Sequence, residues 1–273
     1  MSAVRELCEV VERRRVGEYQ ALTLAAPRIA EAARPGQFVH LLAGDDRSFP
    51  LRRPFSIWRA GPGVVEVVFD VVGAGTRAMA RLRAGDLVDL LGPLGRGFEP
   101  PREPAGCLLA GGGYGAAPLY FLAGELRARG CRVDLVIGAA TAARLLDAAG
   151  AARLGHGLTV TTDDGSAGRR GLVTDPLPEL LARTGATRVY ACGPMPMLAA
   201  VSRLAAAAGV PCQVAVEEQM ACGTGICFSC VLPVGGEAGE PTRMARSCLE
   251  GPVFDGTAIA WAELGHPELE PAG

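Results

Sequence analysis

The chain has 273 residues, of which 49% are hydrophobic and 21% are charged, and its formal net charge is −2. This near-neutral charge gives no electrostatic reason to expect a nucleic acid or an anionic membrane as a partner. The length suggests two domains with a small third unit, and the absence of lysine excludes Schiff-base chemistry on a lysine side chain.

Nine cysteines in a chain of this length are too few for a disulfide scaffold. Their number is odd and four of them gather near the C-terminus, so we expect a reducing, cytoplasmic environment. The first residues carry acidic side chains and run into Glu12-Arg13-Arg14-Arg15, which is unlike a secretory signal.

The first third of the chain alternates short apolar runs with turn residues, as the strands of a small β domain do. Runs at 19–25, 38–43, 64–71 and 86–91 are the expected strands, and Arg53 begins another. Closely spaced strands of this kind predict a sandwich or a barrel. We expect an N-terminal antiparallel β-barrel over residues 1–100.

Two motifs in this domain have the chemistry of a cofactor site. Arg53-Pro54-Phe55-Ser56 combines a phosphate-binding guanidinium, an aromatic ring and a hydroxyl, although a strand with one core phenylalanine fits equally. In Gly73-Ala74-Gly75-Thr76 the chain turns, and we expect Thr76 to open a short helix whose N-terminus binds phosphate. A glycine turn with a threonine cap is the structural alternative.

After a proline-rich joint at 100–104 the apolar pattern changes from alternating to continuous. The uncharged stretch 105–124 is long enough to span a membrane, but glycines and Pro118 interrupt it, so we expect no membrane span. Residues 106–110 and 132–137 instead read as strands buried on both faces, with a glycine-rich turn and a helix between them. Without strict G-x-G-x-x-G spacing, we still expect four turn residues to contact a nucleotide: Gly111, Gly112, Gly113 and Gly115.

Further along, strands at 158–162 and 187–192 flank a helix at 177–183. Cys192-Gly193-Pro194 opens another helix at a strand's carboxyl end, where ligands bind in open α/β sheets. We therefore expect these three residues along the nucleotide site of a central open parallel α/β domain, over residues 101–217. None of the three histidines lies in a motif, so we interpret Cys192 as a buried small residue and name no catalytic residue.

Four cysteines near the C-terminus form the sharpest pattern of the chain: Cys222, Cys227, Cys230 and Cys248. The spacing C-x₄-C-x₂-C…C is that of plant-type [2Fe–2S] clusters. Zinc is the alternative, but three cysteines in one tight loop suit a cluster better than the separated pairs typical of zinc. We expect a small [2Fe–2S] lobe over residues 218–273, with a surface hairpin around Gly235-Gly236 before the fourth cysteine.

Taken together, these motifs resemble the electron-transfer subunit of dihydroorotate dehydrogenase type B, in the ferredoxin–NADP reductase superfamily. The resemblance spans almost the whole chain. Its most specific part is Gly251-Pro252-Val253-Phe254, close behind the fourth cysteine, because wider reductases share the other motifs.

The resemblance implies that FAD and one [2Fe–2S] cluster bind to this chain, with NAD on the α/β domain. Carried over by position, the residues that hold FAD are Arg53, Pro54, Phe55, Ser56, Gly75 and Thr76, with Phe69 and Asp70 beside its ring. The four cysteines bind iron. The resemblance further implies a partner, a separate FMN-containing subunit that oxidises dihydroorotate to orotate in pyrimidine biosynthesis, in a heterotetramer of two plus two.

The implied function is electron transfer from the partner's FMN through the cluster and FAD to NAD⁺. A reductase subunit of a hydrogenase or of a ferredoxin:NADP transhydrogenase shares the same modules and is the alternative. A cluster-binding module without catalysis is a third reading, in which the glycine loops are only structural.

Three residues depart from the family's pattern. Asp70 stands where a basic or neutral residue is expected, and Tyr114 and Ala116 replace smaller or branched residues in the glycine loop. Tyr114 would lie on the path of the nicotinamide. Arg144 would meet the 2′-phosphate of NADP or be a solvated helix residue, so the choice between NAD and NADP stays open.

Overall fold

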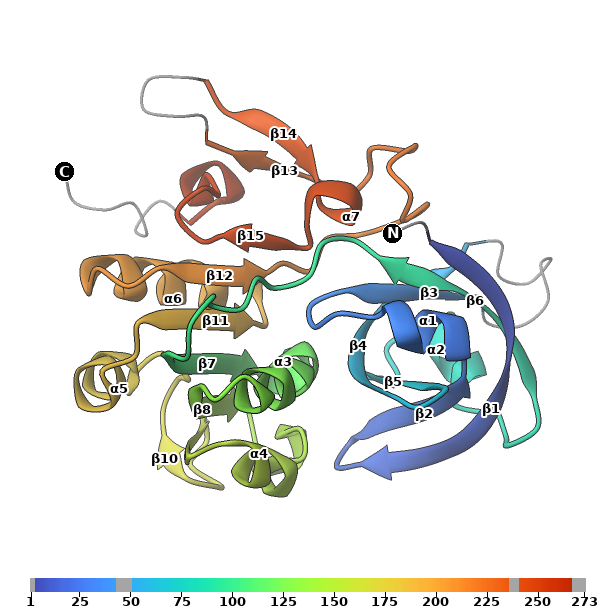
Figure 1. Cartoon of the computed structure of the whole chain (residues 1–273), viewed down its shortest axis with the longest axis horizontal. Helices are drawn as coiled ribbons and strands as arrows, with labels where there is room; N and C mark the ends of the chain where they lie inside the picture. The colour runs from blue at the N-terminus through green and yellow to red at the C-terminus, as the bar shows by residue number, and fades with distance from the viewer. Residues whose placement is uncertain (1–2, 43–50, 236–240, 267–273) are drawn as a thin grey trace.

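The computed structural model describes residues 3–42, 51–235 and 241–266. They form a closed barrel, a seven-stranded sheet covered by helices and a small C-terminal lobe that lies above both (Figure 1). The fold class predicted from the sequence is therefore confirmed. The predicted domain boundaries at 100 and 217 stay predictions.

The barrel closes in the order β1-β2-β5-β4-β3-β6, and its neighbouring strands are antiparallel. The strands are β1 (Val4–Val16), β2 (Tyr19–Ala25), β3 (Phe38–Leu42), β4 (Arg53–Gly61), β5 (Val64–Phe69) and β6 (Leu87–Leu94). Val39 and Leu41 of β3 point into the barrel core, so Phe38 and His40 point outward. Two short helices accompany the barrel: α1 (Pro27–Ala32) and α2 (Ala74–Met79).

The second sheet has the order β10-β9-β8-β7-β11-β12-β15. Its strands are β7 (Gly106–Gly112), β8 (Arg132–Ala139), β9 (Gly157–Thr162), β10 (Arg169–Arg170), β11 (Arg188–Cys192), β12 (Cys212–Ala215) and the antiparallel edge strand β15 (Val253–Asp255). The chain winds outward from β7 in one direction to β9, and then from β11 in the other. Ligands bind open α/β sheets at such a switch point, outside the carboxyl ends of the strands.

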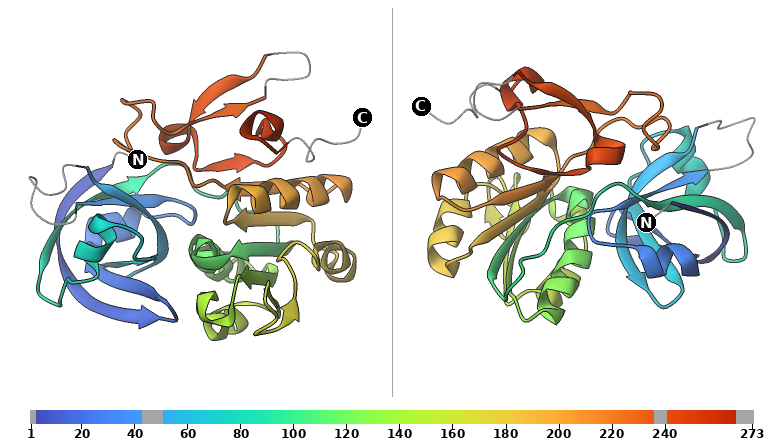
Figure 2. Two further views of the ribbon diagram at one scale, coloured as in Figure 1. Left: turned by 180° about the vertical axis from the view of Figure 1, so that it is seen from behind. Right: turned by 45° about the horizontal axis from the view of Figure 1, so that its top comes forward.

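Helices cover both faces of this sheet and bury two separate apolar cores (Figure 2). On one face lie α3 (Ala117–Ala128) and α4 (Ala148–Leu154), and on the other α5 (Leu177–Thr184) and α6 (Met195–Ala207). The short 3-10 helices are η1 (Gly113–Ala116) and η2 (Ala142–Arg144). The uncharged stretch is strand β7, turn η1 and helix α3, as predicted. No helix in the described ranges is long and apolar enough to cross a membrane.

The C-terminal lobe contains the cysteine loop and the antiparallel hairpin of β13 (Val231–Val234) and β14 (Arg243–Arg246). The predicted hairpin is thus confirmed by its two paired strands, while Gly236 lies outside the described residues. Helix α7 (Ser247–Glu250) and the 3-10 helix η3 (Trp261–Leu264) complete the lobe. Phe38 and Leu94 of the barrel pack with Cys230 and Cys248, which joins the lobe to the barrel.

Candidate functional site

A hollow of about 290 Å³ lies where the barrel, the sheet and the lobe meet. Six of the residues predicted to hold FAD line it: Pro54, Phe55, Ser56, Phe69, Asp70 and Thr76. The rings of Phe55 and Phe69 lie 5.6 Å apart between centroids and are tilted to each other. Apolar walls with a few polar groups fit a planar flavin ring. We call this space the flavin hollow.

Arg53 and Gly75, also predicted to hold FAD, lie against each other beside the flavin hollow. A Cβ at Gly75 would come within 2.6 Å of Arg53 Nε, so the missing side chain leaves the space that the guanidinium occupies. The guanidinium also donates a short hydrogen bond to the carbonyl of Leu51. The contact between Arg53 and Gly75 thus holds a side chain that can bind phosphate at the start of β4, next to α2.

Thr76 is the third residue of α2, which begins at Ala74, so the helix starts two residues earlier than predicted. Its Oγ1 accepts hydrogen bonds from the backbone N–H groups of Val72 and Gly73, both at 3.0 Å. The hydroxyl therefore stabilises the turn into the helix, which is the structural alternative for this motif. Its role toward FAD stays a prediction.

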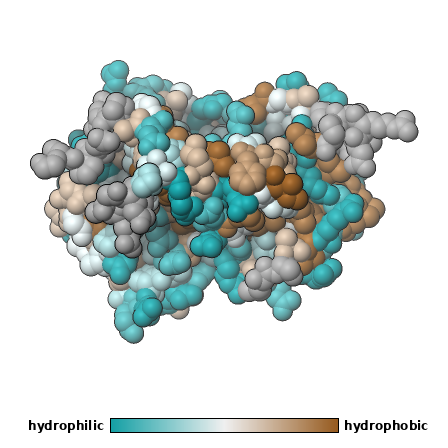
Figure 3. Space-filling model, turned by 90° about the horizontal axis from the view of Figure 1, so that it is seen from above, coloured by the Kyte–Doolittle hydropathy of each residue, from teal (hydrophilic) through white to brown (hydrophobic). Residues whose placement is uncertain are grey.

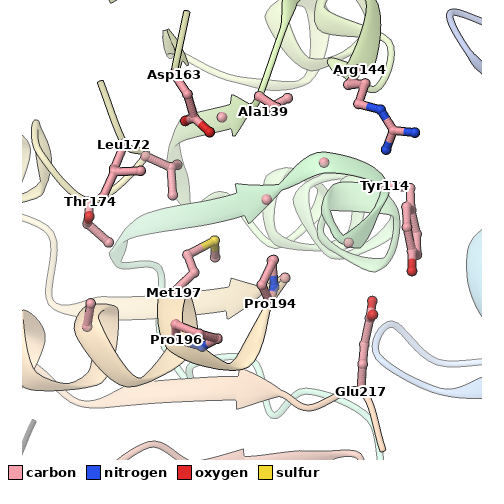
Figure 4. A pocket seen from close by; sticks show the side chains of 18 of the residues that line it. Tyr114, Ala139, Arg144, Asp163, Leu172, Thr174, Pro194, Pro196, Met197 and Glu217 are labelled. Atoms are coloured by element: carbon pink, nitrogen blue, oxygen red, sulfur yellow. The ribbon is translucent and has the colours of Figure 1, made fainter. Parts of the chain in front are cut away.

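A second hollow, of about 490 Å³, opens at the carboxyl ends of β7, β8 and β11 (Figure 4). Five of the residues predicted to contact a nucleotide line it: Gly112, Gly113, Gly115, Gly193 and Pro194. A Cβ at Gly115 would lie 2.8 Å from Gly193 Cα, and one at Gly112 would lie 2.6 Å from Met197 Sδ. Glycine is needed because the two loops pack directly against each other. We call this space the nucleotide hollow.

Gly111 and Cys192, also predicted at the nucleotide site, do not line the nucleotide hollow. A Cβ at Gly111 would lie 2.7 Å from the Cβ of Ala116, so this glycine lets the turn fold back on itself. Cys192 is buried at the end of β11 and lines the flavin hollow instead. Burial, and to a lesser degree the charge of Glu217, raise the pKa of its thiol well above its usual value. This agrees with the interpretation of Cys192 as an inert packed residue.

Tyr114 and Glu217 line both hollows. Figure 4 shows the phenol oxygen of Tyr114 and the carboxylate of Glu217 pointing toward each other across the gap. The charge of Glu217, followed by burial, raises the pKa of Tyr114 to about 12. Desolvation by the surrounding protein raises the pKa of Glu217 although part of the residue is exposed, and its interaction with the Tyr114 hydroxyl partly offsets this shift.

Sequence reasoning missed Glu217 and three further lining residues of the flavin hollow that follow it: Glu218, Gln219 and Met220. One signal was available, because these residues come directly after the short apolar run of β12. The carboxyl edge of a parallel sheet is where such residues meet a ligand. They also connect the flavin hollow to the cysteine loop.

Asp70, which departs from the family's pattern, forms an ion pair with Arg144 across the boundary between the barrel and the sheet, at 3.0 Å. Arg144 also pairs with Glu18 at 3.1 Å. Arg144, the cation predicted as a possible partner of a 2′-phosphate, is thus paired with two carboxylates. Tyr19 Oη fixes the same turn by donating to the carbonyl of Arg144 at 2.8 Å.

The four predicted iron ligands come together as two pairs of thiols. Cys222 and Cys227 lie on the outer loop, while Cys230 and Cys248 are buried beneath it. Among the described residues, no three of the His, Cys, Asp and Glu side chains converge on a single metal position. Two pairs of cysteines suit a cluster with two irons, to which four cysteines bind.

Backbone N–H groups of the loop point at the sulfur of Cys222. The amides of Thr224 and Ile226 donate to its Sγ at 3.4 and 3.3 Å. Burial alone would raise the pKa of Cys222, but the amide of Thr224, the backbone and thiol of Cys227 and the amide of Ile226 outweigh it and lower the pKa to about 6. Gly223 and Gly225, at φ +66° and +81°, provide the left-handed turns that aim the amides inward. The loop therefore favours thiolate, the form that binds iron.

Residues 217–260 match the family model of the iron-sulfur cluster binding domain of dihydroorotate dehydrogenase B. The dihydroorotate dehydrogenase B (NAD(+)) electron transfer subunit of Geobacillus thermodenitrificans is 40% identical over 256 residues, which cover 92% of this chain and 96% of that protein. The subunit of the same name from Desulforamulus reducens is 38% identical over 238 residues, with 86% and 90% covered.

Among solved structures, a chain of an NADH-dependent reduced ferredoxin-NADP oxidoreductase superposes with a TM-score of 0.83 at 32% identity, covering 95% of this chain and 91% of that one. A ferredoxin NADP⁺ reductase from Neisseria gonorrhoeae shares the fold, with a TM-score of 0.59 at 19% identity over 76% of this chain and 92% of that one. The family resemblance drawn from the motifs is thereby confirmed. The chain belongs to the family of electron transfer subunits of dihydroorotate dehydrogenase B.

Proposed function

We propose that this chain carries electrons from a partner subunit that oxidises dihydroorotate, through a [2Fe–2S] cluster and FAD, to NAD⁺. One observation carries the proposal: the three sites adjoin. The nucleotide hollow meets the flavin hollow at Tyr114 and Glu217, and Met220 of the flavin hollow lies two residues before Cys222. When bound, flavin exchanges single electrons for hydride, which links one-electron to two-electron chemistry.

The barrel residues hold FAD in this proposal. Phe55 and Phe69 form the apolar wall of the flavin hollow, and Ser56 supplies a hydroxyl there. Arg53, whose guanidinium occupies the space left by the missing side chain of Gly75, would bind the FAD phosphates. On the side of the α/β sheet, Cys192 lines the flavin hollow and Gly193 lines the nucleotide hollow, so neither residue would put a bulky side chain between flavin and nucleotide.

The glycine turn after β7 holds the nucleotide. With no side chain at Gly113, a pyrophosphate can approach the backbone of the turn closely, while Gly112 and Gly115 let the turn pack against Gly193 and Met197. The carboxylates of Asp70 and Glu18 already neutralise Arg144, which supports NAD rather than NADP as the co-substrate.

The cysteine loop presents apolar side chains to solvent beside the proposed cluster ligands. Ile226 is 80% exposed and Phe228 is 60% exposed. Seen from above the lobe, hydrophobic residues gather in the middle of the face between hydrophilic ones (Figure 3). Exposed apolar groups rimmed by polar ones mark a docking surface, so we place the dehydrogenase partner here, in a heterotetramer of two plus two.

We place the assembly in the cytoplasm, because all nine cysteines are free in the structure. A reductase subunit of a ferredoxin-NADP oxidoreductase complex is the second candidate. It rests on the TM-score of 0.83 with a chain of such an enzyme. The two candidates differ in the partner that would dock on the cysteine loop.

Native purification of the tagged chain, with identification of the co-purifying subunit, tests the proposal. We expect an FMN-containing partner, and NAD⁺ reduction by dihydroorotate only when both subunits are present. A partner with several iron–sulfur clusters and ferredoxin-dependent activity would refute it, as would dihydroorotate oxidation by this chain alone.

A matched pair of variants tests the docking surface. Phe228→Ser should weaken partner binding and leave NADH oxidation with an artificial acceptor intact. Leu87→Ser, on a barrel side chain that is 62% exposed, should leave both properties unchanged. Equal partner binding by the two variants would contradict the docking surface.

A further inference from the structure

His40 is a fully buried histidine on the outer face of the barrel, outside every motif considered so far. It lies in β3, where Val39 and Leu41 fill the barrel core and His40 points the opposite way. Such an outward residue would ordinarily meet solvent. It is buried here because the cysteine loop of the C-terminal lobe covers it.

The contact with the loop is at Gly223, the residue after Cys222. A Cβ at Gly223 would lie 2.5 Å from Cε1 of His40, 2.6 Å from Nε2 and 2.9 Å from Nδ1. These similar distances place the Gly223 Cβ position over the face of the imidazole, beside Cε1 and both nitrogens, so the ring lies flat against the cysteine loop. Phe38, on the same face of β3, lies 5.6 Å from His40 between ring centroids and packs with Cys230 and Cys248.

Neither ring nitrogen of His40 has a hydrogen-bond partner within the described part of the chain. A neutral imidazole carries one N–H donor and one acceptor, and leaving either unsatisfied in a buried position costs about 1–3 kcal/mol. The loop that packs on the ring carries Cys222 and Cys227, so the cluster site can supply the missing partner.

We propose that His40 donates an N–H hydrogen bond to a sulfur of the [2Fe–2S] cluster or of a cysteine that binds it, and thereby raises the cluster's reduction potential. The inference rests on the proposed cluster ligands. Reduction adds negative charge to the cluster, and a hydrogen-bond donor stabilises that charge. His40 is thus a positioning and tuning residue at the boundary between barrel and lobe, not a ligand of iron.

The chain contains only three histidines, which makes selective labelling decisive. The full chain is loaded with cluster, labelled with ¹⁵N-histidine, reduced, and measured by electron spin echo envelope modulation. We expect a histidine nitrogen coupling in the wild type that His40→Gln abolishes. His156→Gln, at a residue whose Nδ1 accepts from the backbone of Val133, should retain it.

Redox titration followed by EPR gives the second readout. In His40→Leu we expect a more negative cluster potential, by roughly a tenfold change in the reduction equilibrium, or about 59 mV for one electron. His40→Gln, which keeps a donor, should lie closer to the wild type, and the FAD potential should not move in either variant.

Absence of a histidine coupling in the wild type would overturn the proposal even if His40→Leu failed to load its cluster. An unchanged cluster potential in a fully loaded His40→Leu protein would also overturn it. If His40→Leu lost its iron and the wild type showed no histidine coupling, the His40 ring would only fill space beneath Gly223. If no cluster assembles in the wild type at all, the proposed cluster site fails rather than the role of His40.

Discussion

Tyr114 and Glu217 stand together where the nucleotide hollow meets the flavin hollow, with their polar ends facing each other (Figure 4). One comes from the glycine turn after β7 and the other from the segment after β12. In the function proposed above, a nicotinamide would pass between them to reach the flavin. Two predictions follow from their position.

Tyr114→Val should increase the affinity for NAD⁺ and NADH. The Tyr114 ring packs edge to face on Tyr19, with centroids 5.7 Å apart, and has to leave this contact to admit a nicotinamide. Such aromatic pairs contribute about 0.5–1.5 kcal/mol, so dissociation constants should fall by roughly two- to tenfold. Tyr114→Phe, which keeps the ring pair, should bind like the wild type. Weaker binding by the valine variant would show that Tyr114 holds the nicotinamide instead.

The affinity for NAD⁺ should fall as the pH drops through the raised pKa of Glu217. Above that pKa the carboxylate is charged and attracts the positive nicotinamide ring, and below it the attraction is lost. NADH lacks this ring charge, so its affinity should change little. For a partly solvated pair the effect is up to about 1 kcal/mol, or about fivefold.

Calorimetric titrations across pH check the role of Glu217. Glu217→Gln should remove the pH dependence of NAD⁺ binding. Glu218→Gln, at a neighbour that lines the flavin hollow but not the nucleotide hollow, should keep it. The assignment fails if the two variants behave alike.

Gly75→Ala should release FAD while preserving the fold. The new Cβ would push the flexible guanidinium of Arg53 out of the space it occupies, since the two would lie 2.6 Å apart. Loss of a charge-assisted hydrogen bond of about 1.5–3 kcal/mol should weaken FAD binding by roughly ten- to a hundredfold. Flavin fluorescence measures this directly. Gly73→Ala, with open space at its Cβ and extended backbone, is the matched control and should bind FAD normally.

Cys227→Ser should lose iron and the visible absorbance band of the cluster while keeping FAD. Its thiol is exposed on the loop and separate from the flavin hollow, so the change should not disturb the barrel. Cys131→Ala, a buried cysteine in the core of the α/β sheet, should keep iron, FAD and colour. A colourless wild-type protein loaded with zinc would contradict the cluster assignment.

Local sequence determined much of this protein, because turn chemistry and strand periodicity act over a few residues. The alternation at Tyr19–Ala25 matches β2 from end to end, and the cysteine spacing identified the loop that gathers the four thiols. Strand β1 was missed because charged residues fill most of it and only two of its residues, Cys8 and Val10, are buried. An outer strand of this composition resembles a solvated segment until its neighbours are known.

Tertiary structure alone decided the contacts between units. Asp70 looked misplaced until the fold brought Arg144 to it, 74 residues further along the chain. Glu217 and His40 belong to no sequence motif. Each acquires its environment only when separate units of the fold pack around it. The reason is that burial, side-chain pKa values and hydrogen-bond partners depend on distances across the fold. Local sequence patterns do not encode those distances.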